Sequence, residues 1–79
     1  MPIAKVSLAH AARIIPAHPS SLRRALDHFG IRERNANGQR EMDEPIAKLM
    51  RHSKQRSGYL YPRHINTREK LLAAALELA

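Results

Sequence analysis

The chain has 79 residues, of which 14 are lysine or arginine and seven are aspartate or glutamate, giving a formal net charge of +7. This length allows one small domain with a modest core, and the basic excess favours a polyanionic partner: DNA, RNA or an anionic membrane. The absence of cysteine excludes disulfides and thiolate metal sites, and no apolar run approaches the ~20 residues that a membrane span requires. With no signal-peptide core near the N-terminus, we expect a cytoplasmic protein of a bacterial host cell, encoded by the bacterium, a phage or another mobile element.

Residues 1–6 are expected to form a short strand or an arm, and a helix should follow them. Ser7 suits the N-terminal cap of that helix because its hydroxyl can accept a backbone N–H. Apolar side chains then recur at the i, i+3, i+4 and i+7 spacing of one helix face, at Leu8, Ala11, Ala12 and Ile15. Pro16 follows, and because its ring holds φ near −65°, it predicts a turn other than the left-handed turn that glycine forms.

A second helix is predicted over residues 20–29, with Leu22, Leu26 and Phe29 on its buried side. Gly30 follows at the position where a left-handed C-terminal cap is common. At 100° per residue, the opposite side of this helix is polar. It carries Ser20, Arg24 and Asp27, with Arg23 on one flank and Ser21 and His28 on the other.

Residues 31–42 predict a β-hairpin with Asn37-Gly38 at its tip, since both positions of a tight hairpin turn need positive φ. This tip defines the pairing of the two arms: Ala36 faces Gln39, Asn35 faces Arg40, and Arg34 faces Glu41. The last pair would be a favourable cross-strand contact between opposite charges.

Three further segments are predicted after the hairpin. A third helix begins at residues 43–45, where acidic groups and a proline suit a helix start, and it has Ile46, Leu49 and Met50 inside. Residues 53–58 are expected to be a basic linker, and residues 59–61 a brief strand. A final helix, capped by Asn66 with Glu69 three residues later, carries a wide apolar arc. This arc serves either the small core or a dimer face.

The stretch between the first two helices reads Pro-Ala-His-Pro-Ser-Ser-Leu-Arg over residues 16–23. It resembles the winged helix-turn-helix proteins of the MerR and phage-excisionase type, whose pattern there is Gly-Val-Ser-Pro-Ser-Thr-Leu-Arg. Four residues match, and Pro16 and His18 stand where the family has Gly and a Ser or Thr cap. The resemblance covers about the first two-thirds of the chain. It implies a mainly α fold with a small β-hairpin: a winged helix-turn-helix domain over residues 1–56, then a C-terminal extension over 57–79 whose helix packs or dimerises.

The resemblance also implies a function: a sequence-specific regulator that binds double-stranded DNA, either a small transcriptional repressor or an excisionase-like factor. The second helix would enter the major groove, and the basic hairpin would act as a wing. In the family an arginine lies at the DNA where this chain has Arg23, and another lies in the second wing strand, as Arg40 does. The candidate DNA-binding residues are Ser20, Ser21, Arg23, Arg24, Asp27, Arg32, Arg34, Asn37, Gln39 and Arg40.

No catalytic residue, metal site or cofactor is expected. The five histidines lack the i, i+3 or i+4 spacing of a metal site, and Asp43 and Glu44 have a structural role at a helix start. Besides duplex DNA, the candidate partners are a second copy through the C-terminal helix and an integrase or polymerase. The alternative is a phage-type inhibitor or an RNA- or protein-binding module without sequence-specific DNA recognition, in which Phe29, Tyr59 and Tyr61 could stack on bases.

Overall fold

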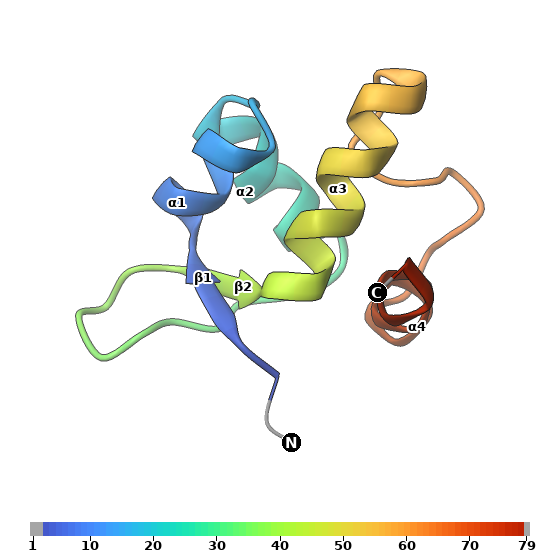
Figure 1. The fold of residues 1–79 in the computed structure, drawn as a ribbon. Helices are drawn as coiled ribbons and strands as arrows, with labels where there is room; N and C mark the ends of the chain where they lie inside the picture. Colours follow the sequence, from blue (N-terminus) through green and yellow to red (C-terminus); the bar gives the residue numbers. More distant parts are fainter. Residues whose placement is uncertain (1–2, 79) are drawn as a thin grey trace.

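The computed structural model describes residues 3–78, which form four helices and a two-stranded antiparallel sheet (Figure 1). Strand β1 (Lys5–Ser7) leads directly into α1 (Leu8–Ile14), and α2 (Pro19–His28) follows after a short turn. Strand β2 (Glu41–Asp43) runs into α3 (Glu44–Ser57), and α4 (Arg68–Leu78) ends the described chain. The expectation of a mainly helical protein with a small β element is therefore confirmed.

The sheet joins the N-terminal segment to the chain that follows the hairpin. Val6 pairs with Met42, and backbone bonds from Leu8 to Arg40 and from Glu44 to Ala4 continue the pairing beyond both strands. Of the strand or arm expected over residues 1–6, the strand forms at Lys5 and Val6 and extends to Ser7, while residues 1 and 2 lie outside the described residues. The first arm of the predicted hairpin contributes no strand to this sheet, and its backbone is bonded to that of the second arm at one isolated bridge, between Arg34 and Arg40.

Both ends of α2 are capped as a stable helix requires. His18 precedes the helix, and its Nδ1 accepts the backbone N–H of Ser20 at 3.1 Å. At the other end Gly30 has a φ of +70°, and Ile31 donates its N–H to the Leu26 carbonyl. These are the left-handed residue and the six-to-one bond of a Schellman motif, so the expected glycine cap is confirmed.

The turn after α1 differs from expectation at Pro16, which has a φ of +28°. The prediction that the proline ring excludes positive φ here is wrong. Ala17 donates its N–H to the Ala12 carbonyl at 3.2 Å, again a six-to-one closure, and this closure requires a left-handed residue at the position of Pro16. The helix ending therefore prevails over the preference of the proline ring, at a cost in backbone strain.

The hairpin loop (residues 32–40) has a different register from the predicted one. Asn35 pairs with Gln39 and Arg34 with Arg40, so Arg34 does not face Glu41, and the predicted charge pair is wrong. A four-residue turn closed by the bond from Gly38 N–H to the Asn35 carbonyl forms the tip. Only Gly38 has positive φ, and the Asn35 side chain accepts the N–H groups of both Asn37 and Gln39. A side-chain cap therefore selects a longer loop than the two-residue turn.

The third helix extends further than predicted. Residues 53–57 belong to α3, and Gly58, with a φ of +80°, is its C-terminal cap, so the predicted basic linker over residues 53–58 is wrong. Residues 59–61 are bends and not a strand. The cap of α4 is Thr67, whose hydroxyl accepts the N–H of Lys70 at 3.2 Å. The predicted capping box of Asn66 and Glu69 is therefore wrong, and a cap by Thr67 alone takes its place.

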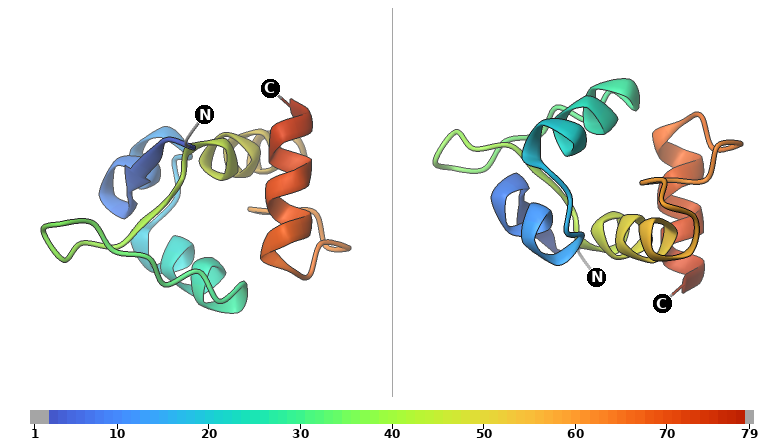
Figure 2. Two further views of the ribbon diagram at one scale, coloured as in Figure 1. Left: turned by 90° about the horizontal axis from the view of Figure 1, so that it is seen from below. Right: turned by 90° about the horizontal axis from the view of Figure 1, so that it is seen from above.

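A single apolar core holds these elements together, and α3 lies between α1 and α4 (Figure 2). The expected inner faces of the first three helices are buried in it. Leu71 and Ala75 of α4 are buried against α3, whereas Leu76 and Leu78 are exposed. The fully buried large side chains are Ile15, Leu22, Leu26, Ile31, Met42, Ile46, Met50, Leu71 and Asp43.

Asp43 is the polar member of this buried set, and it sits in a ring of charges. Its carboxylate is only 1% exposed and accepts hydrogen bonds from Lys5 of β1 and from Arg68 of α4, the latter at 3.1 Å. Lys5 and Arg68 both also pair with Glu33 of the hairpin loop. The ring joins four segments that are distant in the sequence, and it replaces the helix-capping role expected for Asp43, which makes no side-chain capping bond to α3.

Candidate nucleic-acid interface

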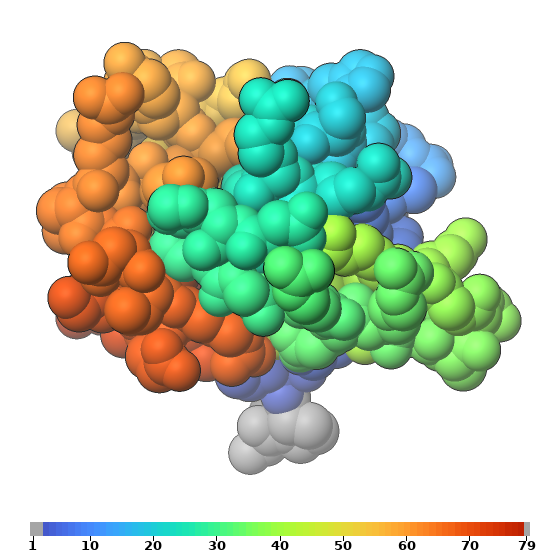
Figure 3. Space-filling model, turned by 180° about the vertical axis from the view of Figure 1, so that it is seen from behind, coloured from blue at the N-terminus to red at the C-terminus, as the bar shows by residue number. Residues whose placement is uncertain are grey.

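The outer face of α2 is polar and exposed, as its sequence spacing predicted. Leu22 and Leu26 are fully buried beneath it, so the helix is held by one side and leaves the other side free. The exposed residues of this face and its flanks are Ser20, Ser21, Arg23, Arg24, Asp27 and His28. In Figure 3, α2 lies between the green hairpin loop and the orange segment that follows α3.

The hairpin loop is attached to α2 by Arg40. One guanidinium nitrogen of Arg40 lies 2.9 Å from Asp27 Oδ1, and another donates to the Ile31 carbonyl at 2.7 Å. The Arg40 side chain is only 12% exposed, while Arg32, 4.0 Å from the same carboxylate, is well exposed. Asp27 and Arg40 therefore neutralise one another and position the loop, which leaves Arg32 as the more accessible charge at this place.

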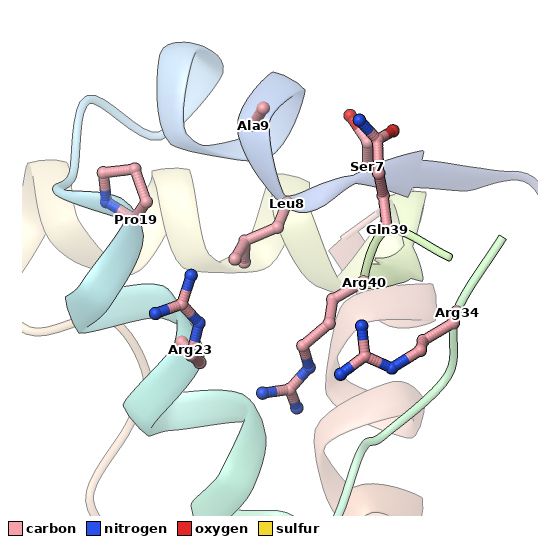
Figure 4. Close-up of a pocket in the computed structure, with 8 residues that line it drawn as sticks. All are labelled: Ser7, Leu8, Ala9, Pro19, Arg23, Arg34, Gln39 and Arg40. Carbon is pink, nitrogen blue, oxygen red and sulfur yellow. The ribbon is translucent and has the colours of Figure 1, made fainter. Parts of the chain in front are cut away.

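A groove of about 470 Å³ lies between the start of α2 and the hairpin loop (Figure 4). Arg23 enters it from α2, and Arg34, Gln39 and Arg40 enter it from the hairpin loop, while the N-terminal end of α1 forms the remaining wall. The described residues that line it include no acidic side chain. The groove therefore brings together, from two elements, three of the cationic side chains predicted from the sequence.

The tip of the hairpin loop is stiffened by its own side chains. Arg34 donates to the Gly38 carbonyl at 2.7 Å, and Asn35 donates to Gln39 at 3.3 Å. Asn37 and Gln39 are exposed. Asn37 lies at the tip, outside the residues that line the groove, so the structure separates it from the arginine cluster.

A segment that sequence reasoning did not associate with α2 flanks its other side. Tyr61 lies parallel to His28 with ring centroids 5.8 Å apart, and it meets Phe29 edge-on at 4.7 Å. Leu60 and Tyr61 form one wall of a shallow hollow of about 310 Å³, and Ser21, Arg24 and His28 form the other. No short-range pattern indicates this contact, because it depends on how α3 turns the chain back toward α2.

Residues 3–78 contain no cluster of three histidine or acidic side chains placed to hold a metal ion. None of the helices in this range is both long and apolar enough to cross a lipid bilayer. No protein-family model, curated protein or solved structure matches this chain.

Proposed function

We propose that the protein is a small regulator that binds double-stranded DNA in a sequence-specific manner and has no enzymatic activity. The observation that carries this proposal is the groove beside the exposed face of α2, which is lined by Arg23 and Arg34, neither of which forms an ion pair with a described residue, and by Arg40, which Asp27 holds in place. A helix whose inner side is buried, with this arginine-lined groove along its flank, has the form needed to enter a major groove beside a sugar-phosphate ridge.

The α2 face supplies groups suited to reading bases. Arg24 is exposed and points away from Leu22 and Leu26. An arginine so placed can donate two hydrogen bonds to guanine, which discriminates against other bases by about 1–3 kcal/mol. Ser20 and Ser21 lie exposed in the first turn of α2, at the positive end of the helix, where their hydroxyls can bind phosphate.

The hairpin loop supplies charge for the DNA backbone. Arg34 and Arg23 approach the groove from opposite walls, and Gln39 adds an exposed amide. Arg32 is exposed on the same loop. We assign to the Asp27–Arg40 pair a positioning role: it keeps the loop at a set distance from α2, so that loop and helix meet neighbouring parts of one duplex.

The net charge of +7 also supports a polyanionic partner. Each phosphate that an arginine or lysine neutralises releases counterions, so the affinity should fall steeply as salt rises. In a cell, such a protein would act as a compact repressor or as an excisionase-like factor that assists an integrase or blocks a polymerase. Both roles need only DNA binding from this chain.

Selection from a random duplex library at physiological salt tests the proposal. We expect one preferred site, and Arg24→Ala should change the preferred sequence at about one base pair. Arg34→Ala should weaken all duplexes by a similar factor and reduce the salt slope by about 1. Lys70→Ala, at the outer side of α4, is the matched control and should change neither.

Single-stranded RNA of random sequence serves as the competitor in the same assay. A protein that prefers this RNA, with no change caused by Arg24→Ala, would instead be the RNA-binding module that the sequence left open. A duplex affinity that is independent of both Arg24 and Arg34 would rule out the assigned surface.

A further inference from the structure

A second groove, which the proposed function does not use, lies between α3 and the segment that follows it. Its volume is about 360 Å³. Leu49, Tyr61 and Pro62 give it an apolar floor, while Arg56 and Arg63 lie at its edge. We call this the cationic groove; its full lining is Leu49, His52, Ser53, Arg56, Ser57, Tyr59, Tyr61, Pro62 and Arg63.

The cationic groove combines an apolar surface with positive charge that has no acidic partner nearby. The Arg63 guanidinium lies 4.9 Å from the centroid of the Tyr59 ring, which is 53% exposed. Neither Arg56 nor Arg63 forms an ion pair within residues 3–78, and the described lining contains no carboxylate. Exposed tyrosine and arginine side chains are the types that contribute most at protein interfaces.

The outer face of α4 has the complementary character. Leu71 and Ala75 lie on the inner side of this helix and are buried, whereas Leu76 lies on the outer side and is 49% exposed. At 100° per residue, Glu69 lies on the same face as Leu76, and Glu77 adjoins it. We call this the acidic ridge: Glu69, Ala73, Leu76 and Glu77. Lys70 is also exposed and lies beside Glu77, and its ammonium donates to Asn66 Oδ1 at 3.4 Å.

The glutamates of the acidic ridge are distinctive in being free. Glu69 and Glu77 are exposed and form no ion pair with any described residue. Most of the other acidic residues are used within the fold, since Asp27, Glu33, Asp43 and Glu44 all form ion pairs. The chain thus presents one apolar surface bordered by free negative charge and another bordered by free positive charge.

We propose that the acidic ridge of one molecule docks into the cationic groove of a second copy of this chain. Leu76 would fill the floor between Leu49 and Tyr61, and Glu69 and Glu77 would meet Arg56 and Arg63. The contact joins two different surfaces, the acidic ridge of one molecule and the cationic groove of the next. Each molecule therefore has one ridge and one groove available for contacts with other copies. It is made by residues outside the α2 and hairpin-loop surface, so it can form whether or not DNA is bound.

Nucleic acid is a poorer occupant of the cationic groove. The outside of a duplex presents phosphates and sugars, and it has no apolar projection that could replace water over Leu49 and Pro62. A base could reach the floor only after leaving its stack, which loses the stacking free energy. An apolar side chain on a helix, flanked by carboxylates, matches both the floor and the rim.

The test uses charge reversal in the full chain and sedimentation velocity without DNA. Variant one is Arg56→Glu/Arg63→Glu, and variant two is Glu69→Arg/Glu77→Arg. We expect the wild type to form dimers or longer assemblies as its concentration rises, and each variant alone to remain monomeric. Mixing the two variants should restore association, because each then offers charges opposite to those of the other. All substituted positions except Arg63 lie on helices, so loss of helical structure would be visible by circular dichroism. This measurement checks that every variant is folded.

Leu76→Gln provides a second measurement that leaves the charges intact, and it should weaken wild-type association at least tenfold. Leu78→Gln, on a neighbouring exposed position outside the ridge, is its matched control and should have a much smaller effect. Failure of the mixed variants to associate, or a wild type that stays monomeric at millimolar concentration, overturns the proposal.

Two further outcomes would also overturn it. Association that survives Arg56→Glu/Arg63→Glu would mean that two α4 helices pair with each other. A single-stranded oligonucleotide that binds wild type but not this variant, while wild type stays monomeric, would assign the groove to nucleic acid. None of these results bears on duplex binding, so the self-association and the proposed DNA-binding function can fail separately.

Discussion

Arg40 of the hairpin loop lies 2.9 Å from Asp27 of α2, and the same guanidinium donates to the Ile31 carbonyl. A single side chain therefore joins the loop, the helix and the turn between them. This arrangement explains how a loop with one isolated bridge between its arms can hold a defined place beside α2. It also separates residues that shape the interface from those that are free to bind.

Loss of this link should affect both stability and binding. We expect Arg40→Ala to lower the free energy of unfolding by about 1–2 kcal/mol, because the hydrogen bond to the Ile31 carbonyl and the ion pair with Asp27, both made by a mostly buried guanidinium, are removed. Urea denaturation measures this change. Arg32→Ala is the control, since Arg32 is exposed and 4.0 Å from Asp27, and it should change stability by less than about 0.5 kcal/mol. Equal effects of the two substitutions would contradict the structural role of Arg40.

The buried carboxylate of Asp43 should matter more than any other charge in the chain. Asp43→Asn keeps the shape of the side chain but removes the charge that Lys5 and Arg68 share. We expect a loss of about 2 kcal/mol or more in thermal or urea unfolding, because a nearly inaccessible ion-pair partner is removed. Glu44→Gln, which breaks only the exposed pair with Lys48, should cost less than about 0.5 kcal/mol. The prediction fails if Asp43→Asn is as stable as the wild type.

The same ring predicts a dependence of stability on alkaline pH. Burial by itself lowers the pKa of Lys5, but hydrogen bonds to Asp43 and Glu33 outweigh it and raise the pKa above 10.5. A raised pKa means that the folded protein holds this proton more tightly, so the stabilisation is complete below pH 10.5 and declines as the pH rises above it.

Comparison with Lys5→Met isolates this contribution from the titration of other groups. The stability difference between wild type and variant should be constant at neutral pH and should shrink above about pH 10.5. Urea unfolding at a series of pH values provides the measurement. A difference that grows with pH would have the wrong sign for a raised lysine pKa.

Pro16 offers a substitution that should stabilise the protein. Its φ of +28° lies in the region that glycine adopts without strain. Pro16→Gly should raise the free energy of unfolding by about 1 kcal/mol, the relieved strain exceeding the added entropy of the unfolded chain. Pro19→Gly is the control: Pro19 occupies the first turn of α2, where proline is favoured, and its replacement should destabilise. A decrease in stability with Pro16→Gly would show that the turn does not require positive φ.

Local features of this chain were predictable where one residue or one spacing decides them. The Ser7 cap, the buried side of α2 and the left-handed Gly30 each depend on atoms a few residues apart. The exposed face of α2 followed from the same spacing, and so did its candidate residues. The register of the hairpin loop did not follow, because the Asn35 side chain competes with the Asn37-Gly38 turn, and that competition depends on geometry.

The sequence by itself determined the helices, the amphipathic face of α2, and the basic excess that any partner must match. These properties arise from periodicity and composition, which act over one or two helical turns. Only the tertiary structure decided which charges are free. Arg40 and Asp27 pair across the fold, Asp43 is buried between Lys5 and Arg68, and Glu69 and Glu77 are left exposed. The physical reason is that an ion pair depends on distance in space, and the packing of α4 and the hairpin loop brings together residues that are distant in the chain.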